Sequence, residues 1–185
     1  PDSKKYFVAN FLDSSLSVLD INNAVSPALA TPNAKPTIDF LNVNGNNYYL
    51  RYDGWYPNGA TQSPVGALPI QTPVSPDGRF VIVANTLSGS IVIINANTNE
   101  VVLSLPCDAG CHGVQFGAKN GGGYYAYVSS KFSNRLIVVD PDPDGFGVGK
   151  DDGSNAEIAG SVLLTRSNHA NTGYLEDGHI HGNEG

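Results

Sequence analysis

The chain lacks methionine, has only two cysteines and carries little charge for its 185 residues. Two cysteines four positions apart cannot form the disulfide framework of a domain of this length. No run of apolar residues approaches the roughly 18 that span a bilayer, and no basic segment with an apolar core opens the chain. We therefore expect no membrane span. Because methionine is absent, we also expect a chain that has been processed or that belongs to a longer protein.

Charged residues make up 15% of the chain, and the 17 acidic residues outnumber the 10 basic ones, which gives a formal net charge of -7. This charge would repel a polyanion, so we expect no nucleic acid partner. The sequence also lacks the Gly-x-Ser-x-Gly nucleophile elbow, a phosphate-binding glycine loop and the His-Glu-x-x-His metalloprotease helix. Hydrolase mechanisms therefore have no residues to carry them, and we expect a noncatalytic protein.

The residues that are abundant favour β-structure. The chain has 21 glycines and 12 prolines, and 41% of its residues are hydrophobic. The valine, isoleucine, leucine, tyrosine and phenylalanine residues come in short runs between turn-forming residues. This pattern predicts an all-β chain with almost no helix.

Three segments of the chain superimpose on one another, at residues 6–20, 80–95 and 125–140. In each, an apolar strand ends in Ala-Asn or Ser-Ser, a polar turn follows, and a second apolar strand closes with Asp or Asn. Each segment is therefore a predicted β-hairpin. The second and third begin 45 positions apart, at 80 and 125, which is a normal length for one four-stranded propeller blade.

The repeat divides the chain into parts of one continuous segment, 1–185. In order these are a partial blade (1–20), a long insertion (21–69) with a possible hairpin at 38–56, a blade (70–106), a blade (107–166) with an acidic loop (141–157), and a loop leading to a further blade (167–185). The stretch 72–79 is expected to supply an inner strand and a tight turn.

The second blade carries the pattern of a known family. Its order is Val-Ser-Pro-Asp-Gly, Val-Ile-Val-Ala-Asn, Ile-Val-Ile-Ile-Asn and Val-Val-Leu-Ser-Leu, followed by His-Gly-Val-Gln-Phe, across residues 74–116. This resembles the YVTN-type β-propeller repeats of secreted and surface-layer proteins. The resemblance implies four-stranded antiparallel blades and a periplasmic, extracellular or cell-surface location.

Three blades cannot close a ring, because propellers typically use four to eight. We therefore expect an incomplete ring whose remaining blades lie on the same polypeptide or on a partner protein chain. The alternative is a small open stack of sheets capped by the insertion.

An acidic loop follows the third hairpin and has calcium-loop spacing. Asp140, Asp142, Asp144 and Asp151 occupy positions one, three, five and twelve, with Gly145 at position six. Alternate carboxylates of this kind can converge on one calcium ion. Position nine, however, is a valine, and position twelve is Asp rather than the longer Glu. The alternative is a solvated acidic turn.

A second candidate site is Cys107-Asp-Ala-Gly-Cys111-His112. It is similar to the covalent haem c signature but has one more residue between the cysteines. The chemistry would be two thioethers with His112 as axial ligand. The alternatives are a small disulfide, free thiols or a metal, and the YVTN-like pattern alone accounts for His112-Gly-Val.

His112, His179 and His181 form a third candidate set, for a transition metal such as copper. His179 and His181 are two positions apart, so on an extended strand both imidazoles would face the same way. The alternative is that these are exposed loop histidines.

Two functions follow from these residues. The first is an extracytoplasmic propeller module that binds or scaffolds a partner and is stabilised by calcium. The second is a redox or electron-transfer subunit with haem c at the cysteines or a metal held by histidines at the mouth of the propeller channel.

Overall fold

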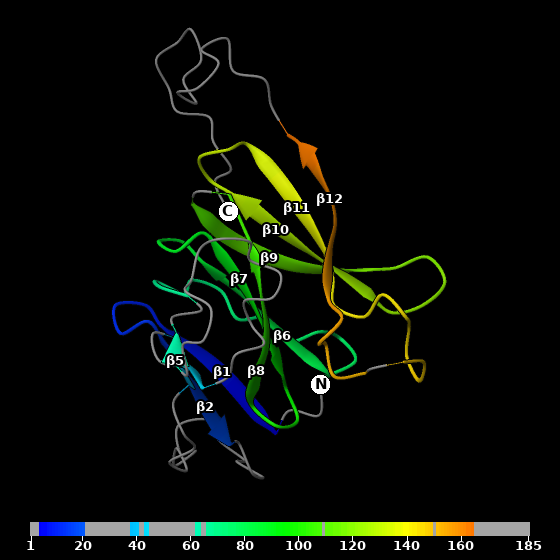
Figure 1. The fold of residues 1–185 in the computed structure, drawn as a ribbon, viewed down its shortest axis with the longest axis horizontal. Helices are drawn as coiled ribbons and strands as arrows, with labels where there is room; N and C mark the ends of the chain where they lie inside the picture. Colours follow the sequence, from blue (N-terminus) through cyan, green and yellow to red (C-terminus); the bar gives the residue numbers. More distant parts are fainter. Residues whose placement is uncertain are drawn as a thin grey trace, which may run out of the picture.

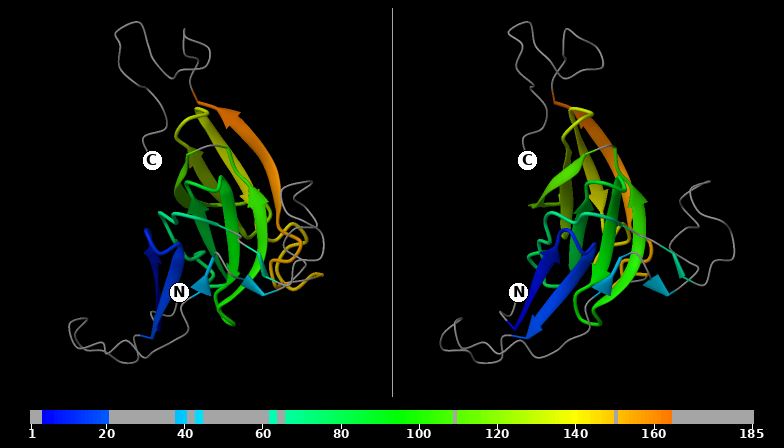
Figure 2. Two further views of the ribbon diagram at one scale, coloured as in Figure 1. Left: turned by 60° about the vertical axis from the view of Figure 1, so that its left-hand side comes forward. Right: turned by 90° about the vertical axis from the view of Figure 1, so that its left-hand side faces the viewer.

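The computed structural model describes residues 4–20, 38–40, 43–44, 62–63, 66–108, 110–149 and 151–164. All regular structure in these ranges is β-strand, with no helix (Figure 1). The prediction of an all-β chain is therefore confirmed. Three antiparallel sheets of three or four strands lie one behind another, as the rotated views in Figure 2 show, and the described residues form no closed ring or barrel.

The three sheets follow the order of the chain. The first sheet contains β1 (Lys5–Asn10), β2 (Ser15–Asp20) and β3 (Ile38–Asp39), and the middle sheet contains β6 (Phe80–Asn85), β7 (Ser90–Asn95) and β8 (Glu100–Pro106). The third sheet is ordered β12 (Glu157–Leu163), β11 (Arg135–Asp140), β10 (Tyr124–Ser130) and β9 (Cys111–Ala118). A short separate pair joins β4 (Val43–Asn44) to β5 (Gln62–Ser63).

The three predicted hairpins are confirmed. β1 pairs with β2, β6 with β7, and β10 with β11, each in antiparallel register. The hairpin predicted at 38–56 falls mostly outside the described residues. Within them, Ile38–Asp39 pairs with β2, and Val43–Asn44 pairs with Gln62–Ser63.

The middle sheet is buried on both faces because its strands alternate two sets of apolar side chains. Phe80, Ile82 and Ala84 of β6 belong to the core shared with the third sheet. Val81 and Val83 of the same strand belong to the core shared with the first sheet. Nearly continuous apolar sequence in β6 and β7 therefore reflects a strand pair that lies between two neighbours.

The predicted inner strand of the middle blade is present only in part. Residues 68–74 run antiparallel to β6, with the Ile70 N–H donating to Ala84 O (3.0 Å) and the Ile82 N–H donating to Pro73 O (3.3 Å). The pairing is limited to two isolated bridges, at Pro69 and Val74. Pro73 lies between the two bridges and has no N–H to donate, which explains why this segment does not form a continuous strand.

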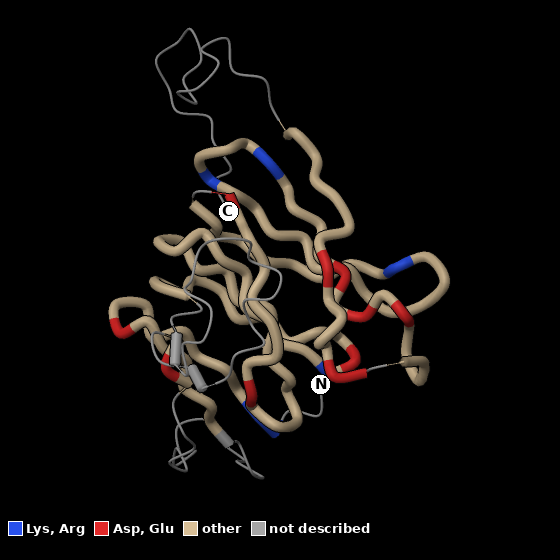
Figure 3. The backbone as a smooth tube through the Cα atoms, viewed as in Figure 1, with Lys and Arg blue, Asp and Glu red and all other residues tan. Residues whose placement is uncertain are grey.

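The hairpin turns and the other connections lie at opposite ends of the sheets (Figure 1). We call one end the tip end, formed by the turns 11–14, 86–89 and 131–134. We call the other the loop end, formed by the turns 76–79, 96–99 and 119–123 and the acidic loop. Figure 3 shows acidic residues gathered mainly at the loop end.

Candidate functional sites

Arg79 is the centre of the loop end. It is the last residue of the turn 76–79, directly before β6, and its side chain is only 12% exposed. Its guanidinium forms ion pairs with three carboxylates, those of Asp77 (3.0 Å), Asp142 (2.8 Å) and Asp151 (3.4 Å). It therefore connects the middle sheet to the acidic loop of the third sheet.

Two aromatic rings flank the same guanidinium. The Arg79 Cζ atom lies 4.8 Å from the centre of the Phe80 ring and 5.0 Å from that of Phe146. Contacts of this kind are cation–π interactions, which strengthen where water is excluded. Phe146 belongs to the acidic loop, so the loop is held to Arg79 by an aromatic contact as well as by charge.

The charges of this cluster shift their own pKa values. Burial alone would lower the pKa of Arg79, but contact with Asp142 and Asp77 raises it. Burial would raise the pKa of Asp77, but hydrogen bonds from Ser75 and Arg79 and the charge of Arg79 lower it below its ordinary value of 3.8. Both groups are therefore held in their charged forms at neutral pH.

Lys119 neutralises the first carboxylate of the acidic loop. Its Nζ atom lies 2.5 Å from Asp140 Oδ2 and donates a second hydrogen bond to the backbone oxygen of Asp142 (3.2 Å). Burial would lower the pKa of Lys119, but the hydrogen bond and charge of Asp140 raise it. Lys119 thus joins the β9–β10 turn to the start of the loop.

The four aspartates that the sequence singles out contact several partners, and two of them, Asp142 and Asp151, share Arg79. Asp140 contacts Lys119, and Asp142 contacts Arg79. Asp144 accepts a hydrogen bond from the Asn155 amide (2.7 Å), and Asp151 accepts two from the Gly147 N–H (2.9 and 3.0 Å). No group of three or more His, Cys, Asp or Glu placed to hold a metal ion occurs within the described ranges.

Asp142 is nevertheless unusual, because it is only 6% exposed and neither of its carboxylate oxygens makes a hydrogen bond to a described residue. Its described charge partner is Arg79. A buried carboxylate without hydrogen bonds is destabilised unless a cation compensates it. Asp142 therefore depends on Arg79, or on another cation that could take its place.

Cys107 and Cys111 form a disulfide at the tip end, with their Cα atoms 6.0 Å apart. The disulfide loop connects the middle sheet to the third sheet, and the Cys107 N–H donates to Gly89 O in the middle turn (2.8 Å). Of the sequence alternatives for this pair, the structure has the disulfide. Haem thioethers would require both of these sulfur atoms.

His112 directly follows the disulfide, in β9. Its imidazole is partly buried, and its Nδ1 atom is enclosed without a hydrogen bond to any described residue. His179 and His181, with which a metal site was predicted, lie outside the described residues. The structure therefore places one member of this candidate set.

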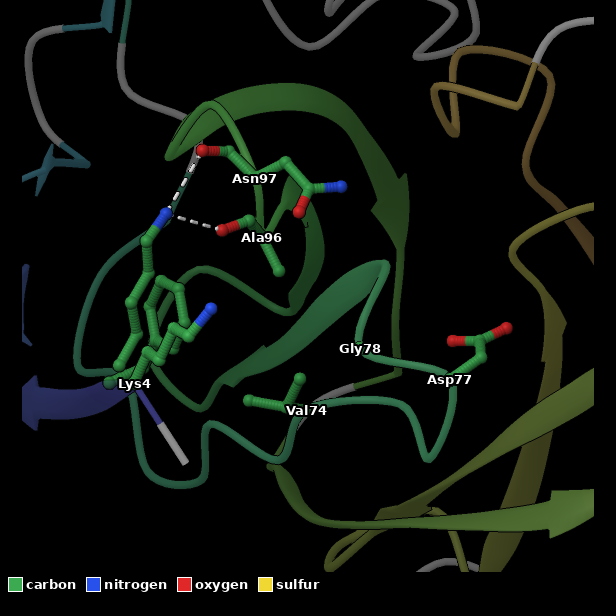
Figure 4. A pocket seen from close by; sticks show the side chains of 8 residues that line it. Lys4, Val74, Asp77, Gly78, Ala96 and Asn97 are labelled. Atoms are coloured by element: carbon green, nitrogen blue, oxygen red, sulfur yellow. Dashed lines mark hydrogen bonds between the residues drawn. The ribbon is translucent and has the colours of Figure 1, made fainter. Parts of the chain in front are cut away.

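A pocket of about 270 Å³ lies at the loop end between the first and middle sheets (Figure 4). It is lined by Lys4, Lys5, Phe7, Val74, Asp77, Gly78, Ala96 and Asn97. The Lys5 ammonium donates to the backbone oxygens of Ala96 and Asn97 (2.9 Å each) and to Asn99 Oδ1 (3.0 Å). Its three protons are thus used to fasten β1 to the β7–β8 turn.

The sequence prediction missed Arg79 and Lys119. Their partners in the acidic loop lie far along the chain, with Arg79 and Asp151 separated by 72 positions and Lys119 and Asp140 by 21. A signal was present nonetheless, because Arg79 is the basic residue at the end of a Ser-Pro-Asp-Gly turn that enters a fully apolar strand. In the structure this cation is nearly buried and is paired with three carboxylates.

Known proteins show little similarity to this chain. No family model matches the chain, and no curated protein matches it. Among solved structures, it is similar to Kuenenia stuttgartiensis hydrazine synthase, at 18% identity and a TM-score of 0.47, over 76% of this chain and 30% of that one. The chain therefore spans less than a third of that protein's length, and a likeness at this level carries no argument about activity. The described part of the chain contains no helix long and apolar enough to cross a membrane.

Proposed function

We propose that this chain is a segment of an extracytoplasmic β-propeller of the YVTN-repeat type that binds or scaffolds a partner and does not catalyse a reaction. The repeated packing supports this proposal. The middle sheet packs against one face of each neighbouring sheet. In each sheet the packed side chains include those of its copy of the repeated hairpin. The disulfide supports an oxidising compartment outside the cytoplasm.

The observation that carries the proposal is the apolar character of the outer face of the third sheet. One face of this sheet packs on the middle sheet through Val128, Ile137 and Val139. Tyr127 pairs with Val138, and Leu136 pairs with Val162, so these four share the opposite face. Val162 is half-exposed there. An apolar sheet face of this kind is suited to a further blade or to a partner protein.

The first test is an absorption spectrum, an intact mass and a native mass of the protein purified from its source. We expect a colourless protein whose denatured mass is two hydrogens below that of the reduced chain. We also expect a native particle heavier than the chain that contains additional propeller or a second, different polypeptide. A Soret band with added mass at Cys107 and Cys111 would instead support the redox function, with His112 as the ligand.

We include calcium in this proposal because of the spacing of Asp140, Asp142, Asp144 and Asp151 and because of the buried carboxylate of Asp142. An ion there would have to replace Arg79 or Lys119 as the partner of at least one carboxylate. We expect millimolar calcium to raise the melting temperature relative to chelator, because a ligand that binds only the folded state stabilises it.

A matched pair of variants identifies the calcium site. Asp144→Asn removes one candidate ligand whose described partner is Asn155 and should abolish the shift. Asp108→Asn at the tip end should leave it unchanged. An unaltered melting temperature of the original protein in calcium would mean that Arg79 and Lys119 alone hold the loop.

A further inference from the structure

The three hairpin turns of the tip end share a feature that the proposed function does not use. The second residue of each turn is a large apolar side chain exposed to solvent. These residues are Leu12, Leu87 and Phe132, which are 87%, 71% and 68% exposed. Turns favour Gly, Asn, Asp, Ser and Pro, so nothing in turn formation calls for leucine or phenylalanine at this position.

The turns hold these side chains in defined positions. Each turn ends in a residue with positive φ, namely Ser14, Gly89 and Asn134. The second and third turns are also fastened to the incoming connections, because the Leu87 N–H donates to Ala67 O (3.2 Å) and the Lys131 N–H donates to Gly110 O (2.8 Å). The apolar side chains are thus presented outward by an ordered backbone.

The turns lie in a row along one side of the molecule (Figure 1), and charge changes sign along it. The first turn carries the exposed Asp13, and the middle turn, 86–89, carries no charge. The third carries the exposed Lys131, with Arg135 next to it and 3.9 Å from Asp108. Figure 3 shows an acidic segment at the first turn, and basic segments beside an acidic one at the third.

The row of turns is negative at one end, neutral in the middle and positive at the other. Two such rows are therefore complementary when they face each other in opposite directions. We propose that the tip end is an isologous interface between two copies of this chain, with the two-fold axis passing by Leu87. In this arrangement Leu87 meets Leu87 of the second copy. Leu12 lies opposite Phe132, and Asp13 lies opposite Lys131.

The charge of the whole chain favours this occupant over an anionic surface. The net charge of -7 opposes an approach to acidic lipid, and it opposes an approach of two copies through their acidic loop ends. At the tip end the nearby described charges balance, Asp13 and Asp108 against Lys131 and Arg135. Three apolar anchors on each side form a small interface, so the dimer should be weak and should depend on concentration.

This surface is separate from the outer face of the third sheet, and the inference goes beyond the proposed function. Its test is sedimentation velocity of the 185-residue chain over the micromolar range. We expect the mass to rise from 19.4 kDa toward twice that value with concentration. A chain that stays monomeric at every concentration overturns the inference. That result would not bear on the native complex with a different polypeptide that the proposed function expects, so the two proposals can fail separately.

Substitutions separate this surface from any other. Leu87→Asp places two carboxylates against each other at the axis and should abolish dimerisation. Val148→Asp changes another exposed apolar side chain, at the loop end, and should leave the dimer intact. Thermal melting of both variants checks that they fold. A dimer that survives Leu87→Asp overturns the assignment to the tip end.

A charge swap tests the reversed order. Asp13→Lys and Lys131→Asp should each weaken the dimer several-fold, because each places like charges opposite one another. The double variant should recover most of the loss, since the exchanged pair is again complementary. Equal weakening in the double variant overturns the reversed arrangement. If the chain is monomeric and binds neutral phosphatidylcholine vesicles in a manner abolished by Leu87→Asp, the tips bind lipid and the dimer is overturned.

Discussion

The two ends of this molecule join neighbouring sheets by different chemistry. At the tip end, the middle and third sheets are joined by a disulfide loop and by a hydrogen bond from the Thr86 hydroxyl to Cys111 O (2.6 Å), and the apolar side chains of Leu87 and Phe132 are exposed. At the loop end, the same two sheets are joined by side chains, with Arg79 between three carboxylates and two rings. Large apolar side chains are therefore left exposed at the end where a covalent bond contributes to the joining, and charged side chains are buried at the end where ion pairs do so.

The largest expected effect comes from removing the cation at the loop end. Arg79→Ala leaves Asp142 buried without its described charge partner, and breaking a buried pair in this way costs about 3 kcal/mol or more of unfolding free energy. Urea denaturation measures it. Adding Asp142→Asn should recover a large part of the loss. Arg135→Ala, the matched change at the tip end, removes an exposed pair and should cost less than about 1 kcal/mol.

The disulfide is the next largest contribution, at the opposite end. Replacing Cys107 and Cys111 together with alanine should lower the unfolding free energy by about 2 kcal/mol, which is the chain-entropy value for so short a loop. Denaturation with and without reductant measures this, because reduction should bring the original protein to the level of the variant. A reductant effect of equal size in the variant would show that it does not come from this bond.

Acid should weaken the loop end. The pKa of Asp77 is lowered in the folded state, so its contribution is present above the unfolded value of 3.8 and is lost as pH falls through the folded value. The raised pKa of Lys119 gives the opposite sign, a contribution lost only above its ordinary value of 10.5. Denaturation midpoints should therefore hold between pH 5 and 9, as estimated from these two values. Asp77→Asn should reduce the loss below pH 4, and an unchanged acid profile would contradict this assignment.

The smallest effect on stability should come from the tips themselves. Leu87→Ser should change the unfolding free energy by no more than about 0.5 kcal/mol, because the side chain is already exposed. Ile91→Ala, a few residues away on a fully buried side chain, should cost about 2 kcal/mol or more. A large loss for Leu87→Ser would mean that the tip side chains support the fold.

The sequence predicted the features that short stretches of chain determine. The three hairpins were predictable because alternating apolar strands and turn residues are local signals. The stretch 72–79 was predicted to supply an inner strand and a tight turn; the turn forms, but the strand is reduced to an isolated bridge at Val74, beside Pro73, which has no N–H to donate. That inference required knowing which neighbour the strand would meet.

The sites were harder to predict because they depend on which segments meet. The spacing of the acidic loop suggested one shared ion, but it could not reveal that Lys119 and Arg79 contact Asp140 and Asp142 from other turns. The tip residues were visible in the aligned repeats, since Leu12, Leu87 and Phe132 occupy equivalent positions. Only their exposure in the structure shows that they do not belong to a core.

The burial of β6 and β7 on both faces has a consequence for how the chain opens. Each of the two cores includes side chains from these strands, so neither core can be lost without exposing the middle sheet. The backbone amides of β6 and β7 should therefore exchange with solvent more slowly than those of β1 and β12, and only through global unfolding. The central hairpin makes the three sheets one cooperative unit.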